Sequence, residues 1–326
     1  MKAAGLIFDN SFSYLDHLGP LCGLLGWPLI VCEPELRERA DTYYPDLTLL
    51  DAEIFQLGAA IDAQFTHLVS CTPRSLLKAA LGNFSFRTLW LPHGHSDKGQ
   101  IFPFLDALRE EETVLLYGKK MVDQLSHLKI PHQITVGNFR WLYYRKRRAF
   151  YDTISLGFSF AKKQKMVFYA PTWEDEEKNC SLWDALPLLA KTLPDSINLL
   201  VKPHPNTVLA HAPKLERLIG KTERENLQFL LETPPIFPLL EQCDAYLGDR
   251  SSIGYDCLFF DKPLFFLDPH GRPEGRDLLS CGVSVTPENA FSFIARADTH
   301  QEQRKAMLRY AFEKMPTPFE NALHNL

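Results

Sequence analysis

The chain has 326 residues, of which 45% are hydrophobic, 23% charged and 12% aromatic, and this composition excludes a disordered or fibrous protein. Its 35 Lys and Arg residues against 40 Asp and Glu leave a formal charge of -5, so no net basic charge points to nucleic-acid binding. At about 150 residues per domain, the length predicts two domains, each large enough to bury a core.

The cysteines and the apolar runs indicate a cytoplasmic protein. The seven cysteines show no CxxC pair or short Cys/His spacing, and their odd number argues against a complete disulfide framework. The first apolar run is interrupted by Asp9, which makes it too short for a secretion signal. No stretch approaches the roughly 20 apolar residues of a membrane span, so membrane contact is expected only at the inner face and only peripherally. No dense carboxylate cluster predicts a metal site, and we expect no cofactor.

In the first half of the chain, short β-rich apolar runs alternate with amphipathic segments, which is typical of βα units around a parallel sheet. The predicted strands are 4–8, 28–31, 67–71, 88–91, 113–116 and 133–136. The predicted helices are 14–25, 73–80, 102–109 and 119–127.

An aromatic and basic run, Phe139–Tyr151, interrupts this alternation, and we predict the domain boundary there. A second series follows, with strands at 164–170, 198–201, 227–231, 245–248, 263–267 and 283–285. Its predicted helices are 183–192, 208–218, 236–242, 252–259 and 290–295, and a last helix at 301–314 is expected to fold back. The sequence therefore predicts two doubly wound Rossmann-like α/β domains, 1–150 and 151–300, that face each other across a cleft, and a terminal helical part, 301–326.

Ligands in such folds bind beyond the carboxyl ends of strands, which directs attention to four short motifs. The first is His93-Gly94, held between Pro92 and the glycine at the end of a predicted strand. A neutral imidazole there can take a proton from a hydroxyl group. The alternative is a histidine that only ends the strand.

The second motif is Lys202-Pro203-His204-Pro205, where a cation and an imidazole leave the sheet together and suit a phosphate or diphosphate. The alternative is a proline-rich turn with a solvated lysine.

The third motif, Asp244–Asp256, places Arg250 and the hydroxyls of Ser251 and Ser252 at the start of a helix, where anions bind. The alternative is that Ser251 only caps its own helix. In the fourth, Tyr169–Trp173, Thr172 can donate to a phosphate and Trp173 can pack beside a base or sugar. The alternative is a tryptophan in the core between the domains.

Taken in chain order, the four motifs and Lys262-Pro263 resemble the CDP-glycerol glycerophosphotransferase family, the teichoic-acid primases and polymerases. That family typically shows HG, YAPTW, KPHP, D-x-x-x-x-D-Y-S-S-x-x-x-D and a K/R-P pair, and the resemblance covers roughly positions 85 to 268.

The resemblance implies a GT-B type fold with an acceptor-side first domain and a donor-binding second domain. It implies transfer of a glycerophosphate-like unit from a CDP-activated alditol to a hydroxyl of a cell-envelope glycan or a lipid-linked acceptor. His93 and His204 are the expected catalytic residues, with His93 as the base. The other expected residues are Lys202, Arg250, Ser251, Ser252 and Thr172 at the diphosphate, Asp256 at the ribose, and Gly94, His95 and Lys98 on the acceptor side.

Two departures bear on this hypothesis. Arg250 stands where the family has Tyr, which adds a cation, and PHGHSDKG replaces the usual WHGTPLK, which leaves the acceptor open. The chain is short for a polymerase, which favours a single addition. The alternatives are a GT-B glycosyltransferase or sugar-nucleotide epimerase that uses a UDP-sugar, and a non-catalytic nucleotide-binding module.

The run Arg140–Arg148, with aromatic residues among its cations, is also a candidate for peripheral contact with an anionic membrane. The alternative is a solvated linker between the domains.

Overall fold

The computed structural model describes residues 2–7, 9, 11–51, 57–97, 107–174, 178–232, 234–267, 277–296, 298–313, 321 and 323. The chain divides into two compact units. The first contains Met1–Gly94, Gln100–Arg148 and Arg309–Leu326, and the second contains His95–Gly99 and Ala149–Leu308.

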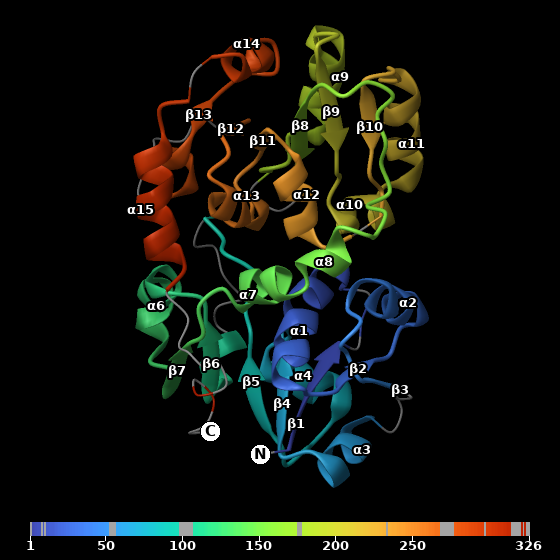
Figure 1. Cartoon of the computed structure of the whole chain (residues 1–326). Helices are drawn as coiled ribbons and strands as arrows, with labels where there is room; N and C mark the ends of the chain where they lie inside the picture. The colour runs from blue at the N-terminus through green and yellow to red at the C-terminus, as the bar shows by residue number, and fades with distance from the viewer. Residues whose placement is uncertain are drawn as a thin grey trace. The chain divides into compact units, whose positions relative to one another are not determined.

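In the first unit, the described residues form one sheet of seven parallel strands in the order β3-β2-β1-β4-β5-β6-β7 (Figure 1). The strands are β1 (Ala3–Ile7), β2 (Leu29–Val31), β3 (Leu49–Asp51), β4 (His67–Ser70), β5 (Arg87–Trp90), β6 (Thr113–Leu116) and β7 (His132–Thr135). Every strand predicted for this half is present to within two residues at each end, except that Phe8 lies outside the described residues. The central strands are buried on both faces, which is why they are continuous apolar runs.

The helices of the first unit are α1 (Phe12–Leu25), α2 (Pro34–Tyr43), α3 (Leu57–Gln64), α4 (Arg74–Leu81), α6 (Lys119–Leu125) and α7 (Phe139–Lys146). Short 3-10 turns, η2 (Leu108–Glu110) and η3 (Ser126–Leu128), complete it. The predicted helix 102–109 lies mostly outside the described residues. The apolar pattern did not predict β3, α2 or α3. For α2 the reason is that the helix is largely charged and buries only Leu36, Ala40 and Tyr43.

The run Phe139–Tyr151, where the sequence predicts the domain boundary, is helical. It forms α7 and the single turn α8 (Arg148–Tyr151), and the side chain of Asn138 caps α7 by accepting from the Trp141 amide at 3.0 Å. Of its aromatic residues, Phe139, Tyr143 and Tyr144 are buried in the packing, whereas Trp141 and Phe150 are half-buried. These three buried rings are therefore not available as a membrane anchor.

Arg140 is also not available for contact with a membrane. Its side chain is only 3% exposed and binds Asp16 of α1, with Nη2 2.5 Å from Oδ2 and Nε donating to the Asp16 carbonyl at 2.8 Å. Tyr44 donates its hydroxyl to the other carboxylate oxygen of Asp16 at 2.9 Å. Arg140 thus fastens α7 to α1, and only the exposed cations from Arg145 onward keep the predicted membrane contact open.

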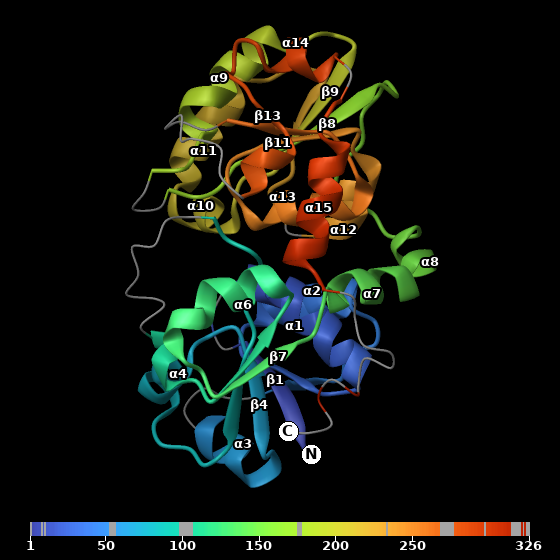
Figure 2. The same ribbon diagram turned by 90° about the vertical axis from the view of Figure 1, so that its left-hand side faces the viewer.

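In the second unit, the described residues form a sheet of six parallel strands in the order β10-β9-β8-β11-β12-β13 (Figure 1). Figure 2 shows β8, β9, β11 and β13 of this sheet from another side. The strands are β8 (Lys165–Ala170), β9 (Ile197–Val201), β10 (Leu227–Phe229), β11 (Ala245–Gly248), β12 (Leu264–Phe266) and β13 (Val283–Ser284). All six lie where the apolar runs predict strands.

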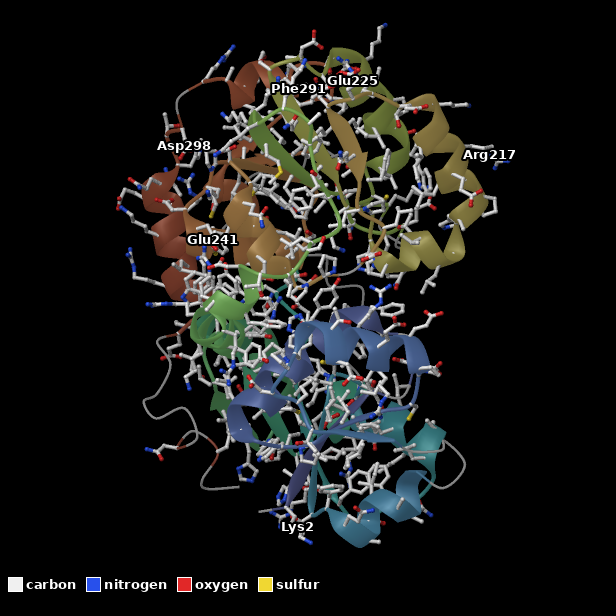
Figure 3. All side chains as sticks on the ribbon, turned by 45° about the vertical axis from the view of Figure 1, so that its right-hand side comes forward. Lys2, Arg217, Glu225, Glu241, Phe291 and Asp298 are labelled. Carbon is white, nitrogen blue, oxygen red and sulfur yellow. The ribbon has the colours of Figure 1, made fainter. Side chains whose placement is uncertain are left out.

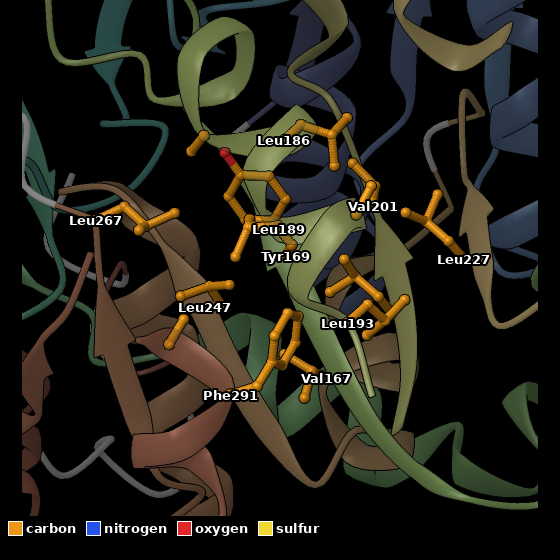
Figure 4. Packing of buried hydrophobic residues seen from close by; sticks show 14 of the residues in the cluster. Val167, Tyr169, Leu186, Leu189, Leu193, Val201, Leu227, Leu247, Leu267 and Phe291 are labelled. Carbon is orange, nitrogen blue, oxygen red and sulfur yellow. The ribbon is translucent and has the colours of Figure 1, made fainter. Parts of the chain in front are cut away.

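The core of this unit lies between the sheet and its helices, as Figure 4 shows for Val167, Leu189, Val201, Leu247 and Phe291. These side chains come from strands and helices far apart in sequence, and all are at most 5% exposed. In the described part of the chain the seven cysteines form no disulfide.

The helices of the second unit are α9 (Leu182–Thr192), α10 (Pro205–Ala210), α11 (Ala212–Lys221), α12 (Ile236–Gln242), α13 (Ser252–Cys257) and α14 (Ala290–Ile294). The 3-10 turns η4 (Leu258–Phe260) and η5 (Leu278–Cys281) follow α13 and precede β13. The helix predicted at 208–218 is split at His211, because Pro213 starts a new helix there. α11 buries Leu215 and Leu218 and turns Arg217 outward (Figure 3).

The last helix, α15 (Gln301–Ala311), begins in the second unit and ends in the first. In the second unit, Arg304 is 2% exposed and binds Asp261 at 2.7 Å and Asp298 at 2.5 Å. In the first, the Glu313 amide donates to the Tyr117 carbonyl at 3.0 Å. Within the described residues, no helix combines the length and apolar character that a membrane crossing requires.

We expect the stability of the first unit to depend on pH through Glu111. Burial raises the pKa of its carboxyl to about 7, although the Arg74 amide and the Thr88 hydroxyl donate to it. The folded state therefore holds a proton that the unfolded state releases near 4.5, so stability falls as pH rises from about 4.5 through 7. The side chain of Glu111→Gln cannot ionise, so the free energy of unfolding of this variant should exceed that of wild type by about 3 kcal/mol at pH 8 and by little at pH 5. Urea unfolding at the two pH values measures this, with Glu112→Gln, a substitution of an exposed neighbour, as the control.

A second prediction concerns the pair between α1 and α7. Arg140→Met leaves the Asp16 carboxylate without its cation, and since Asp16 is 23% exposed the loss should be about 3 kcal/mol, the lower end for broken buried pairs. Replacing both residues, as Asp16→Leu with Arg140→Met, should recover part of it, because no uncompensated charge remains. An unfolding midpoint unchanged in Arg140→Met would contradict this role.

Candidate functional site

The strand order fixes where a ligand of the second unit is expected. From β8 the chain proceeds to β9 and β10 on one side of the sheet, and then to β11, β12 and β13 on the other. The connections that leave β8 and β11 therefore diverge, and in sheets of this topology ligands bind beyond the carboxyl ends of the two strands at such a point. The predicted residues Thr172 and Arg250 lie two positions after the ends of these two strands, and Lys202 directly follows the neighbouring β9.

Asp249 connects the loop after β11 to the loop after β8. It comes directly after β11, is 1% exposed, and its Oδ2 accepts the Thr172 amide at 2.7 Å and the Ser181 amide at 3.2 Å. Gly248, the residue before it, has no room for a side chain, because a Cβ there would clash with the Tyr246 ring and lie 2.9 Å from the carbonyl oxygen of Ala170. One carboxylate thus sets the path of both loops.

Lys202 and His204 occupy the β9 side. Lys202 is 7% exposed, so the alternative of a solvated lysine is wrong. His204 caps α10, with Nδ1 accepting from the Asn206 amide at 3.1 Å. In the neutral ring this bond leaves the proton on Nε2, which makes that nitrogen a donor.

Trp173 lies beside His204, with ring centroids 6.3 Å apart, and it is 39% exposed. The alternative of a core tryptophan is therefore wrong. The next residue, Glu174, holds this loop to α11 through His211 at 3.0 Å and Lys214 at 3.8 Å.

Arg250 lies on the β11 side and is 9% exposed. Its Nη2 pairs with Asp277, and its Nε is buried and has no hydrogen-bond partner among the described residues. A buried guanidinium with one unused N–H can take an anionic ligand while the carboxylate balances part of its charge.

The hydroxyl of Ser251 pairs with Tyr246 at 3.1 Å and does not cap α13, so the alternative of a simple helix cap is wrong. Burial raises the pKa of the Tyr246 phenol, which therefore stays protonated. Ser252 begins α13, and Asp256, predicted to bind a ribose, is 4% exposed one turn further on.

His93 belongs to the first unit. It follows β5, its side chain is exposed, and its ring lies 5.1 Å from that of Tyr14 on α1. Gly94 has a φ of 117°, which side chains rarely permit, so the glycine is required by the turn. Burial raises the pKa of the Tyr14 phenol, which leaves it a neutral donor beside the imidazole.

The remaining acceptor-side predictions fare differently. His95 is 2% exposed and its ring packs against Tyr255 of the second unit, 4.9 Å between centroids, so its burial does not support contact with an acceptor. Lys98 lies outside the described residues. Among the residues that are described, no group of three His, Cys, Asp or Glu side chains could hold a metal ion.

Sequence reasoning missed the residues that organise the site. Asp249, Tyr246, Asp277 and Asp97 bind other protein groups at or near the predicted ligand residues. Of these four residues, only Asp249 could have been singled out from the sequence, because it is an acidic residue directly after an apolar strand.

Comparison with known proteins agrees with this arrangement. Residues 142–271 match the family described as CDP-glycerol:poly(glycerophosphate) glycerophosphotransferase, which confirms the family resemblance drawn from the motifs and indicates a transferase. No curated protein matches the chain in sequence.

Among solved structures, the chain is similar to the wall teichoic acid polymerase TagF, with a TM-score of 0.67 and 14% identity over 99% of this chain and 87% of that one. It is similar to a UDP complex of S. aureus MnaA, with a TM-score of 0.65 and 13% identity over 98% and 94%. A UDP-GlcNAc 2-epimerase from Neisseria meningitidis, bound to UDP-GlcNAc, gives 0.60 and 12% over 100% of each chain. These likenesses confirm the predicted GT-B-like fold class.

The bond network of Asp249 predicts a large effect of its removal. Asp249→Ala leaves two buried amides without an acceptor and should cost about 2–4 kcal/mol of stability in the second unit. Asp249→Asn keeps one carbonyl oxygen and should cost less. Hydrogen exchange of the Thr172 and Ser181 amides, read beside urea unfolding, tests the assignment. Unchanged protection of both amides in Asp249→Ala would contradict it.

Proposed function

We propose that the protein transfers a glycerophosphate-like alditol phosphate from a CDP-activated donor to a hydroxyl of a cell-envelope glycan or lipid-linked acceptor in the cytoplasm. One observation carries the proposal. The segment that matches the glycerophosphotransferase family contains Thr172, Lys202, His204 and Arg250, and these residues follow three adjacent strands of one sheet, β9, β8 and β11.

The donor presents a diphosphate, and the carboxyl edge of this sheet offers cations and N–H donors for it. The buried ammonium of Lys202 and the Nε2 proton of His204 would bind from the β9 side. Arg250 would bind through its unused Nε from the β11 side, with the hydroxyls of Ser251 and Ser252 next to it. Because these charges lie in a site with little water, they stabilise the phosphoryl oxygens more strongly than surface charges do.

Two further residues at this edge of the sheet are proposed to contact the nucleotide. Asp256 is the proposed partner of the ribose hydroxyls, and the exposed ring of Trp173 offers a flat apolar surface for the base or sugar.

In the proposed reaction, the acceptor hydroxyl attacks the phosphorus that carries the alditol. A new O–P bond forms, the P–O bond to the bridging oxygen breaks, and CMP leaves with the electron pair. His93 takes the proton of the acceptor hydroxyl. Charge gathers on the phosphoryl oxygens, so catalysis rests mainly on positioning and on Lys202, His204 and Arg250.

A second candidate uses a UDP-sugar, and the similarity to UDP-bound MnaA and to an epimerase bound to UDP-GlcNAc favours it specifically. The same cations would hold the UDP diphosphate, and the anomeric carbon would replace phosphorus as the electrophile. Thermal-shift measurements with CDP-glycerol, other CDP-alditols and UDP-sugars separate the candidates. The true donor at 100 times its Kd should stabilise by about 2.7 kcal/mol.

The proposal predicts different losses for the two histidines. His93→Ala should lower kcat by about 10² to 10⁴ with donor affinity nearly unchanged, since a general base acts in the transition state. His204→Ala should weaken donor binding as well as turnover, since its contact exists in both states.

Calorimetry with CDP-glycerol and rates of CMP release measure both variants. The exposed His127→Ala serves as the control and should behave as wild type. Equal loss of donor affinity in both variants, or a fully active His93→Ala, would refute these roles.

A further inference from the structure

The chain directly after His93-Gly94 is held by the second unit. His95–Gly99 belongs to that unit, and His95–Asp97 of it are described. Asp97 Oδ2 accepts the Tyr255 hydroxyl at 2.5 Å and the Leu278 amide at 3.1 Å. Two donors on one carboxylate oxygen make a directed, charge-assisted attachment.

The surroundings of Asp97 are closely packed. Tyr255 is 1% and Leu278 is 0% exposed, and the His95 ring covers Tyr255. Gly254 is tight against the same wall, because a Cβ there would lie 2.5 Å from Leu278 Cδ2. Burial, followed by the nearby charge of Asp97, raises the pKa of the Tyr255 phenol, so it remains a donor. The partners of Asp97 are thus fixed by the fold of α13 and η5.

The same two elements carry proposed donor contacts. α13 begins at Ser252 and contains Tyr255 one turn later. η5 is capped by Asp277, whose Oδ1 accepts the Leu279 amide at 3.1 Å and whose Oδ2 pairs with Arg250. Asp97 is therefore attached to the elements that hold Ser252 and the partner of Arg250.

We infer that Asp97 is a positioning residue for the proposed transfer. It ties the segment that follows His93 to α13 and η5, and the four Cα–Cα steps from His93 to Asp97 span at most about 14 Å. Gly94, with its φ of 117°, is the joint between the held segment and the imidazole. Asp97 thereby limits where His93 can move, without touching substrate itself. This inference rests on the proposed function.

The test compares kcat with the Kd for CDP-glycerol in four variants at a temperature where each is folded by circular dichroism. Asp97→Ala should lower kcat 10- to 100-fold with Kd within twofold of wild type, because orientation of the base is lost and the donor contacts are kept. Asp97→Asn should stay within about threefold of wild type, since its amide oxygen can accept both bonds. Tyr255→Phe should lower kcat 3- to 10-fold. The double variant Asp97→Ala/Tyr255→Phe should be no worse than Asp97→Ala, since the bond lost in Tyr255→Phe is already lost in Asp97→Ala.

Asp62→Ala is the matched control. Its carboxylate accepts the Ser85 and Phe86 amides, each at 2.9 Å, immediately before β5, the strand that His93 follows. This variant should lower the unfolding midpoint and leave kcat unchanged.

The outcomes separate the inference from the function on which it rests. Wild-type protein that neither binds CDP-glycerol nor releases CMP refutes the proposed function and the inference with it. Wild-type activity with an unchanged kcat in Asp97→Ala refutes the inference alone. So does a kcat loss in Asp97→Ala that Asp62→Ala reproduces, or one that comes with weakened donor binding, since either would show a structural effect.

Discussion

The two bonds that Asp249 accepts across the carboxyl edge of the second sheet are the interaction on which the rest of the site depends. A parallel sheet ends in loops whose amides have lost their strand partners, and at the strand order reversal these loops diverge. Asp249 supplies an acceptor to the loop after β8 at Thr172 and again at Ser181. Without it, the loop after β8 would have two buried amide donors with no acceptor.

The placement of charge follows from the same constraint. Burying an arginine is tolerable only with a carboxylate beside it, and Arg140, Arg304 and Arg250 each have one. Arg140 and Arg304 use theirs to fasten helices. Arg250 differs because its Nε is left without a partner among the described residues at the ligand edge. The replacement of the family tyrosine by Arg250 thus comes with Asp277, which makes the additional cation acceptable inside the fold.

Three buried tyrosines of the second unit also help to position its loops. Tyr169, Tyr246 and Tyr255 are each 1% exposed or less, and burial raises the pKa of all three phenols. They therefore act as permanent neutral hydrogen-bonding groups, toward Ser181, Ser251 and Asp97 in turn. A neutral phenol orients a loop without adding negative charge beside a site that is expected to bind a diphosphate.

The sequence by itself determined the two parallel sheets and the positions of the ligand-type residues. Strands buried on both faces must be apolar throughout, and residues that follow them must reach the carboxyl edge, so β8, β9 and β11 and the residues after them were readable from local pattern. Tertiary structure alone decided the rest. Whether a polar residue meets ligand or protein depends on partners distant in sequence, as with Arg140 and Asp16, 124 positions apart, or Tyr255 and Asp97, 158 apart. For the same reason a basic, aromatic run proved to be a packed helix, and His95, two residues from His93, proved to be buried against Tyr255.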